Sequence, residues 1–128
     1  MCYTPGLPGT QPNSTELLRL LRDDGRPTVL RVLGDIDMTT ADTFSEGLRA
    51  TARSAVPPGP VIADLNAVEF LGAAGLVVLV QEQAWCDEHG ITLRIVSSAR
   101  PVLRSIKVTG LDATLTVSRT VDEALTHA

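Results

Sequence analysis

The chain has 128 residues, of which 44% are hydrophobic, 20% are charged and only 3% are aromatic. This length and balance predict one globular domain with a core built from aliphatic side chains and alanine. The formal net charge of −4 and the lack of a basic run argue against a nucleic-acid-binding protein. The longest apolar run, residues 76 to 80, is far too short to span a bilayer, and residues 1 to 14 lack a signal-peptide pattern, so we expect a cytoplasmic protein.

The first part of the chain differs from the rest in composition. Residues 1 to 14 contain three prolines and two glycines, which predicts a disordered N-terminal tail. The folded domain should therefore occupy residues 15 to 127.

Apolar periodicity and turn signals divide the remaining sequence into short strands and helices. In chain order, we expect strands at 16–22 and 28–33, a helix from Thr39 or Thr40 to 55, a strand at 61–65 extended by 68–71, a helix at 73–88, a strand at 91–96, a helix capped by Ser98 and ended by Gly110, a strand at 114–117 and a helix at 121–125. The first two strands should form a hairpin, because Asp23-Asp24-Gly25 between them is a turn signal. Regular alternation of helices and strands after this hairpin predicts an α/β domain with a largely parallel sheet.

The helix expected at 73 to 88 should pack one face on the sheet and turn the other towards water. The side chains assigned to the sheet face are Leu76, Val77, Val80, Ala84 and Trp85. Those assigned to solvent are Gln81, Glu82, Asp87 and Glu88. Gly90 follows the helix and suits the left-handed conformation that often ends one.

Residue types that carry chemistry form no convincing site in this sequence. Asp35 and Asp37 share a face of a strand end, but no histidine or third carboxylate is spaced with them, so capping or exposure to solvent is the preferred interpretation. His89 and His127 are expected at the surface, and Cys86 should be a small buried hydrophobe. The sequence has no catalytic triad and no phosphate-binding glycine motif. We therefore expect no metal, no cofactor and no enzymatic activity, and favour a role in binding and regulation.

Three segments carry a resemblance to a known family. They are GDIDMTTADTF at 34 to 44, VIADLNAVEFLGAAGL at 61 to 76, and ITLRIVSSARPVLRSIKVTGLDATLTVSRTVDEAL at 91 to 125. In this order and spacing they resemble the STAS family, especially bacterial anti-sigma-factor antagonists, over about residues 16 to 125. The resemblance implies an α/β, STAS-like single domain: a mixed, mostly parallel sheet of about five strands with helices packed on one side.

The resemblance implies a regulatory binding module. Such antagonists bind an anti-sigma factor, a serine kinase of the ATPase type, and thereby release a sigma factor. The kinase phosphorylates a serine at the start of the second helix, and the added charge of about −1.5 to −2 opposes binding. Here Ala73 replaces that serine, while Gly72 and Ala74 replace the aspartate before it and the Ser/Thr after it. Because alanine has no oxygen to accept a phosphate, we expect no phosphoregulation at residue 73.

The partner-binding surface implied by the resemblance lies at the strand-to-helix corners. The residues assigned to it are Asp35, Asp37, Thr39, Thr40, Asn66, Gly72, Ala73, Ala74, Gly75 and Val77. The small residues also have a structural interpretation, since they let a helix start pack closely on a strand, and the amides there can receive an acidic partner side chain.

Two alternatives to this reading stay open. Regulation could use another corner hydroxyl, although capping is the preferred interpretation for these residues, which are Thr39, Thr40, Ser97 and Ser98. The alternative functions are a STAS scaffold or a subunit of a lipid-transport ABC complex.

Overall fold

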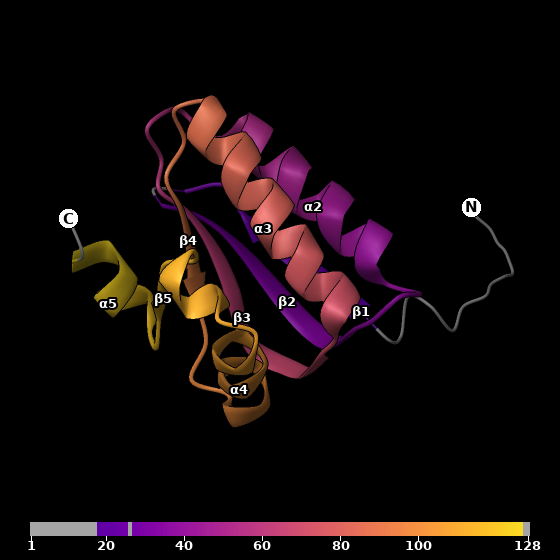
Figure 1. Ribbon diagram of the computed structural model, residues 1–128. Coiled ribbons are helices and arrows are strands. Elements are labelled where there is room, and N and C mark those ends of the chain that lie inside the picture. Colours follow the sequence, from indigo (N-terminus) through magenta and orange to yellow (C-terminus); the bar gives the residue numbers. More distant parts are fainter. Residues whose placement is uncertain (1–17, 26, 127–128) are drawn as a thin grey trace, which may run out of the picture.

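Strands and helices alternate along the chain in the computed structural model, which describes residues 18–25 and 27–126 (Figure 1). The tail expected at 1–14, both ends of the expected domain and His127 lie outside the described residues. The elements are β1 (Leu18–Asp23), β2 (Thr28–Ile36), α2 (Ala41–Ser54), β3 (Val61–Leu71), α3 (Ala73–Glu88), β4 (Leu93–Val96), α4 (Arg100–Val108), the 3-10 turn η1 (Leu111–Ala113), β5 (Val117–Ser118) and α5 (Val121–Thr126).

Most of these elements match the sequence-based expectations, and the last strand differs. β1 and β2 pair as the expected antiparallel hairpin. The two apolar runs expected as a strand and its extension form the single long strand β3. The strand expected at 114–117 is only Val117–Ser118, because the amides of Thr114 and Leu115 donate to the carbonyl of Leu111 and close a helical turn instead.

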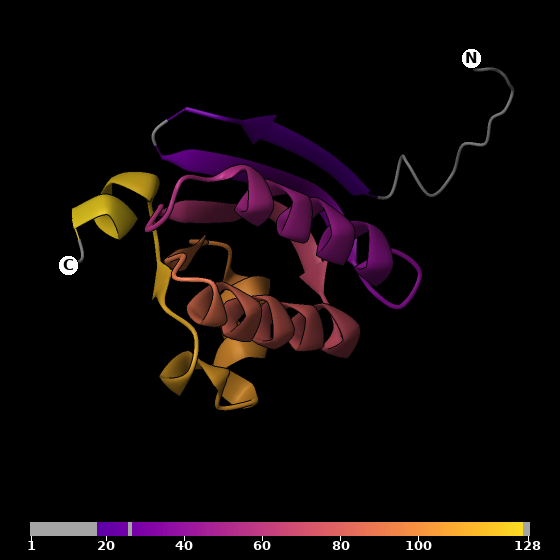
Figure 2. The same ribbon diagram turned by 90° about the horizontal axis from the view of Figure 1, so that it is seen from above.

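The five strands form one sheet whose spatial order, β1-β2-β3-β4-β5, is the order along the chain. β2, β3, β4 and β5 are parallel, so each connection between them carries a helical segment. Right-handed crossovers that always step to the next strand place their helices on the same face of a sheet. Side chains of α2, α3 and α4 accordingly share one core cluster with the sheet, and Figure 2 shows α2 and α3 side by side over it.

The helix α5 lies against the opposite face of the sheet. Ala124 of α5 forms a separate buried cluster with Ile62 of β3 and Val96 of β4. Neighbouring strand residues point to opposite faces, so Ile62 faces away from the main core that holds Val61 and Ala63. The expected mixed, mostly parallel sheet is confirmed, and the expected one-sided layer holds for α2, α3 and α4. α5 departs from it, because Ala124 packs against Ile62 and Val96 on the other face.

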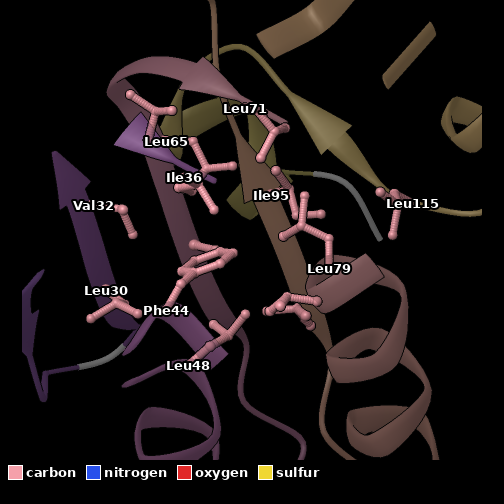
Figure 3. Close-up of a cluster of buried hydrophobic side chains, with 14 of the residues drawn as sticks. Leu30, Val32, Ile36, Phe44, Leu48, Leu65, Leu71, Leu79, Ile95 and Leu115 are labelled. Atoms are coloured by element: carbon pink, nitrogen blue, oxygen red, sulfur yellow. The ribbon is translucent and has the colours of Figure 1, made fainter. Parts of the chain in front are cut away.

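The main core lies between this helical layer and the sheet (Figure 3). Phe44 of α2 is fully buried among aliphatic side chains contributed by every layer, namely Leu30, Val32, Ile36, Leu48, Leu65, Leu71, Leu79 and Ile95. Since fully burying one large apolar side chain contributes about 1.5–3 kcal/mol, this aliphatic cluster contributes strongly to folding despite the scarcity of aromatics.

The face that α3 presents to the core matches the expected one in part, because Leu76 is buried and Val80 and Trp85 pack against the core. The expected water-facing residue Glu82 is 2% exposed, whereas the expected sheet-facing residue Val77 is 53% exposed. Ala84 is also exposed. The first half of α3 is apolar on every side, so its hydrophobic pattern does not distinguish a buried face. Cys86 is buried and Gly90 adopts a φ of 73°, as expected for these two residues.

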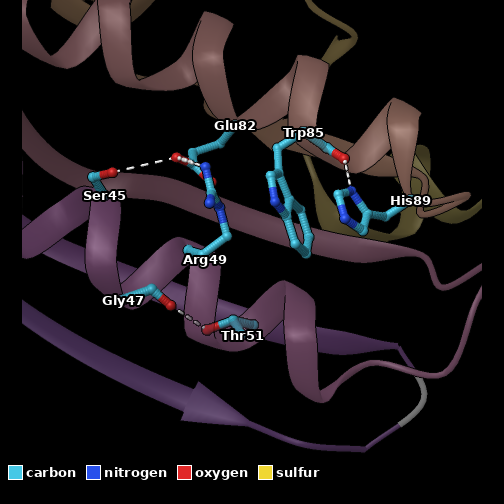
Figure 4. A network of polar contacts seen from close by, with 7 residues as sticks. All are labelled: Ser45, Gly47, Arg49, Thr51, Glu82, Trp85 and His89. Atoms are coloured by element: carbon cyan, nitrogen blue, oxygen red, sulfur yellow. Dashed lines mark hydrogen bonds and ion pairs between the residues drawn. The ribbon is translucent and has the colours of Figure 1, made fainter.

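Glu82 is buried because α2 supplies its partner (Figure 4). Nε of Arg49 lies 2.7 Å from Oε1 of Glu82, Nη2 donates to Oε2 at 3.0 Å, and the hydroxyl of Ser45 donates to Oε2 at 3.3 Å. The hydrogen bonds to Glu82 hold the pKa of Arg49 above its ordinary value. The guanidinium also lies 4.6 Å from the ring centroid of Trp85, and the ring of His89 stacks on the same indole. The contacts of Ser45 and Arg49 with Glu82 and Trp85 hold α2 against α3.

Candidate functional site

The two corners that follow β2 and β3 lie next to each other at one edge of the sheet. Ile36 and Leu71 are paired where these parallel strands end, and the amide of Gly72 donates to the carbonyl of Ile36 at 2.9 Å. The carboxyl ends of parallel strands meet at the same edge, where binding sites of α/β proteins commonly lie. Most of the residues assigned to a partner surface from the sequence are therefore brought together here.

The β2–α2 corner is held rigid by its own polar side chains. Oδ1 of Asp37 accepts the amide of Thr39 at 2.9 Å and its hydroxyl at 2.7 Å, and these bonds hold the pKa of Asp37 below its ordinary value. The hydroxyl of Thr40 donates to the carbonyl of Asp35 at 2.8 Å and accepts the amide of Asp37 at 2.9 Å. Thr40 is 1% exposed, so it shapes the corner and offers no side-chain surface to a partner. Met38 at the tip is 86% exposed.

The β3–α3 corner consists of residues without polar side chains. Gly72 is the N-cap of α3 and provides no side-chain hydrogen bond, while Ala73 is exposed in the first turn. The first amides of a helix have no intrahelical acceptor, so those of Ala73 and Ala74 remain available at this end. Gly75 has a different role, because a Cβ there would lie 2.5 Å from Cγ2 of Ile36. Gly75 is buried, so it allows α3 to approach the sheet and does not form part of the surface.

An apolar groove of about 350 Å³ begins at Ala73 and runs along α3, and we call it the α3 groove. It is lined by Ala73, Leu76, Val77, Val80, Gln81, Thr109 and Leu111. Phe70, which directly precedes the corner, is 51% exposed, so the apolar surface extends beyond the groove. Sequence analysis identified Ala73 and Val77 but missed the opposite wall, Thr109 and Leu111, because no local pattern shows that the end of α4 lies beside α3.

Asn66 belongs to a separate part of the surface. Its Oδ1 accepts the amide of Ser98 at 2.7 Å and the hydroxyl of Ser98 at 3.0 Å, which ties β3 to the loop between β4 and α4. Asn66 lies five residues before Leu71 on β3, or about 16 Å at the usual rise of a strand. Ser98 was expected to cap α4, but the N-cap is Ala99, with no side-chain cap. The buried Ser97 instead accepts the amide of Ala99 at 3.1 Å.

Groups suited to catalysis or metal binding are not assembled at this edge. Within the described part of the chain, no three His, Cys, Asp or Glu side chains are placed to hold a metal ion. The thiol of Cys86 is buried, and this burial is the main cause that raises its pKa to about 11, which keeps it protonated at neutral pH. Among residues 18–25 and 27–126, no helix is long and apolar enough to cross a membrane. The surface that the corners form is suited to contact, with an apolar groove beside helix amides that have no intrahelical acceptor.

A sheet of sequential parallel strands with an edge hairpin, covered by helices on one face, defines a small α/β domain. The STAS domain family matches residues 20–124, and the chain belongs to this family. It is 28% identical over 116 residues to the anti-sigma-F factor antagonist RsfA of Mycobacterium tuberculosis (strain ATCC 25618 / H37Rv), a match covering 91% of each protein. It is 33% identical over 106 residues to RsfB of the same strain, covering 81% of this chain and 83% of that protein.

The fold is also similar to that of a solved relative. The crystal structure of an anti-sigma factor antagonist from Mycobacterium paratuberculosis superposes with a TM-score of 0.72 and 34% sequence identity. The match covers 85% of this chain and 92% of that protein. The expected family and fold are thereby confirmed.

Proposed function

We propose that this protein is a non-catalytic antagonist of an anti-sigma factor, and that it binds an anti-sigma factor of the ATPase-type serine kinase class. The observation that carries the proposal is the α3 groove, which begins at the exposed residue Ala73 and continues into the exposed side chains of Phe70 and Val77. Exposed apolar surface of this kind on a small domain marks a protein-interaction site. Binding there would displace the sigma factor that the anti-sigma factor otherwise holds.

The polar groups around the groove complement this apolar contact. The amides of Ala73 and Ala74 lie at the positive end of the α3 dipole, which favours an acidic side chain from the partner. The rigid corner of Asp37, Thr39 and Thr40 borders the same edge and presents a fixed shape. Because these groups are already held in place, binding costs little conformational entropy at this edge.

The proposed antagonist has no acceptor for a phosphate at its central contact residue. Of the other corner hydroxyls, Thr40 and Ser97 are buried, and that of Thr39 donates to a carboxylate that would repel a phosphate. The hydroxyl of Ser98 is bound to Asn66, away from the start of α3. We therefore propose that the protein remains in its binding-competent form when its partner and ATP are present.

Purified anti-sigma factors of the ATPase kinase class, encoded in the same genome, provide the direct test. The full chain, immobilised as bait, should retain one of them with ADP and with ATP, and should restore sigma-dependent transcription in a purified system with RNA polymerase. Failure to retain any of these kinases with either nucleotide would contradict the proposed function.

The substitution Ala73→Ser should introduce the missing acceptor. Incubated with the retained kinase and ATP, the wild-type protein should take up no phosphate at residue 73, whereas the variant should gain one phosphate and release the kinase, because a doubly charged group in an apolar contact is repelled and costly to desolvate. Intact-mass and peptide mass spectrometry would measure both outcomes. Phosphate on the wild-type chain together with loss of the partner would show that another hydroxyl has taken over control.

A further inference from the structure

A second groove, between α4 and the loops that follow β4 and β5, is strongly basic. Its volume is about 480 Å³, and its lining residues are Ser98, Arg100, Leu103, Arg104, Lys107, Val108 and Arg119. We call it the basic groove. Six of these side chains come from α4 and the loop before it, and Arg119 comes from the loop between β5 and α5.

The positive charge in the basic groove is concentrated and unneutralised. Four of the chain's eleven lysines and arginines line it, although the protein carries a formal net charge of −4. In the part of the chain that the structure describes, none of these four side chains takes part in an ion pair. Glu123 lies nearby, but its carboxylate accepts the backbone amide of Arg119 at 3.2 Å and does not pair with the guanidinium.

Helix α4 places three of these cations on one of its faces. Arg100, Arg104 and Lys107 are spaced by four and three residues and so lie on one face of α4. The opposite face is fixed in the core by Val102 and Ile106, both of which are buried. Like charges at this spacing repel one another, so the face costs stability unless an anion compensates it.

The lining of the basic groove indicates which anion fits. Nucleic acids bind such surfaces through phosphate contacts and through bases stacked on aromatic rings, but no aromatic residue lines this groove. Leu103 and Val108 are interleaved with the cations, and Val108 is 78% exposed. A short segment with carboxylates and apolar side chains complements both features.

We propose that the basic groove binds an acidic peptide segment of a protein partner, with carboxylates on Arg100, Arg104, Lys107 and Arg119 and apolar side chains on Leu103 and Val108. The guanidinium of an arginine supplies paired N–H donors that match the two oxygens of a carboxylate. The contact is therefore fixed in its geometry as well as favoured by charge. This assignment stands on the groove itself and does not depend on which protein occupies the α3 groove.

The test uses a short fluorescein-labelled peptide of glutamate, aspartate and leucine, with a matched peptide in which glutamine and asparagine replace the acids. Fluorescence anisotropy with the full chain should show binding of the acidic peptide only, weakening as salt is raised. Arg104→Glu should weaken it about ten-fold or more, whereas Arg19→Glu, the same charge change at an exposed position on β1, should change it less than two-fold. Amide NMR shifts caused by the peptide should map to residues 98–108 and to Arg119.

Several outcomes would overturn the proposal. Equal weakening by the two variants would mean a non-specific charge effect, and equal binding of the neutral peptide would remove charge as the cause. A single-stranded oligonucleotide or vesicles containing phosphatidylserine, binding more tightly than the peptide and with the same sensitivity to Arg104→Glu, would assign the groove to another class of partner. Circular dichroism of both variants confirms that they are folded.

Discussion

Replacing Arg49 with alanine is expected to lower the free energy of unfolding by about 3 kcal/mol. The carboxylate of Glu82 is 2% exposed and would remain buried after losing both guanidinium hydrogen bonds, with only the hydroxyl of Ser45 left as a donor. The lost contact of the guanidinium with Trp85 adds to this effect. Urea denaturation measures the change directly, and the thermal midpoint should fall by about 10 °C for a domain of this size.

Two controls distinguish the effect of leaving the buried carboxylate of Glu82 unpaired from the effect of losing an arginine side chain. Arg53→Ala removes another arginine near Trp85, with its guanidinium 5.9 Å from the ring centroid, and should cost less than about 1 kcal/mol because no carboxylate is left behind. The double variant Arg49→Leu/Glu82→Leu should recover most of the stability, because an apolar pair can replace a buried ion pair with little loss. A double variant as unstable as Arg49→Ala would show that the buried carboxylate is not the source of the loss.

Replacing Ala73 with glutamate is expected to weaken binding of the proposed anti-sigma factor by about 2–4 kcal/mol, or about 30- to 1,000-fold in Kd. The added carboxylate would stand at the mouth of the apolar α3 groove, where a docked partner would remove water from it without supplying a counter-charge. Titration calorimetry with the purified kinase measures the affinity of each variant.

The fold should tolerate this change, which makes the result interpretable. Ala73 is exposed in the first turn of α3, where a negative charge interacts favourably with the helix dipole. Unfolding free energy should therefore stay equal or rise by a few tenths of a kcal/mol. Ala50→Glu is the matched control, since Ala50 is exposed on α2, well beyond its first turn. Unchanged affinity of the Ala73→Glu variant would exclude the start of α3 from the contact surface.

The features that sequence predicts well are those set by local interactions. The bounds of α3 follow from Gly72 before it and Gly90 after it, and the hairpin follows from the turn at Asp23-Asp24-Gly25, because these signals act over a few residues. The parallel order of the sheet follows from the alternation of helices and strands with short connections.

What sequence does not predict depends on contacts between distant segments. The burial of Glu82 requires Arg49, which lies 33 positions earlier, and nothing local distinguishes this glutamate from one on a solvated face. Thr40 and Ser97 belong to residue types that are mostly exposed, yet the closing of their loops buries both. The α3 groove escapes prediction for the same reason, since one wall comes from α3 and the other from the residues after α4.

The methyl group of Ala73 bears on how such a protein would act inside a cell. In the proposed complex, the alanine at residue 73 offers no hydroxyl to a kinase, so its occupancy would depend on the copy numbers of the two proteins and on their Kd. Response to a signal would then follow synthesis and degradation of the antagonist, on the timescale of protein turnover. Transcription that depends on the released sigma factor would rise steeply once copies of the antagonist outnumber those of the anti-sigma factor, as in a titration past its equivalence point.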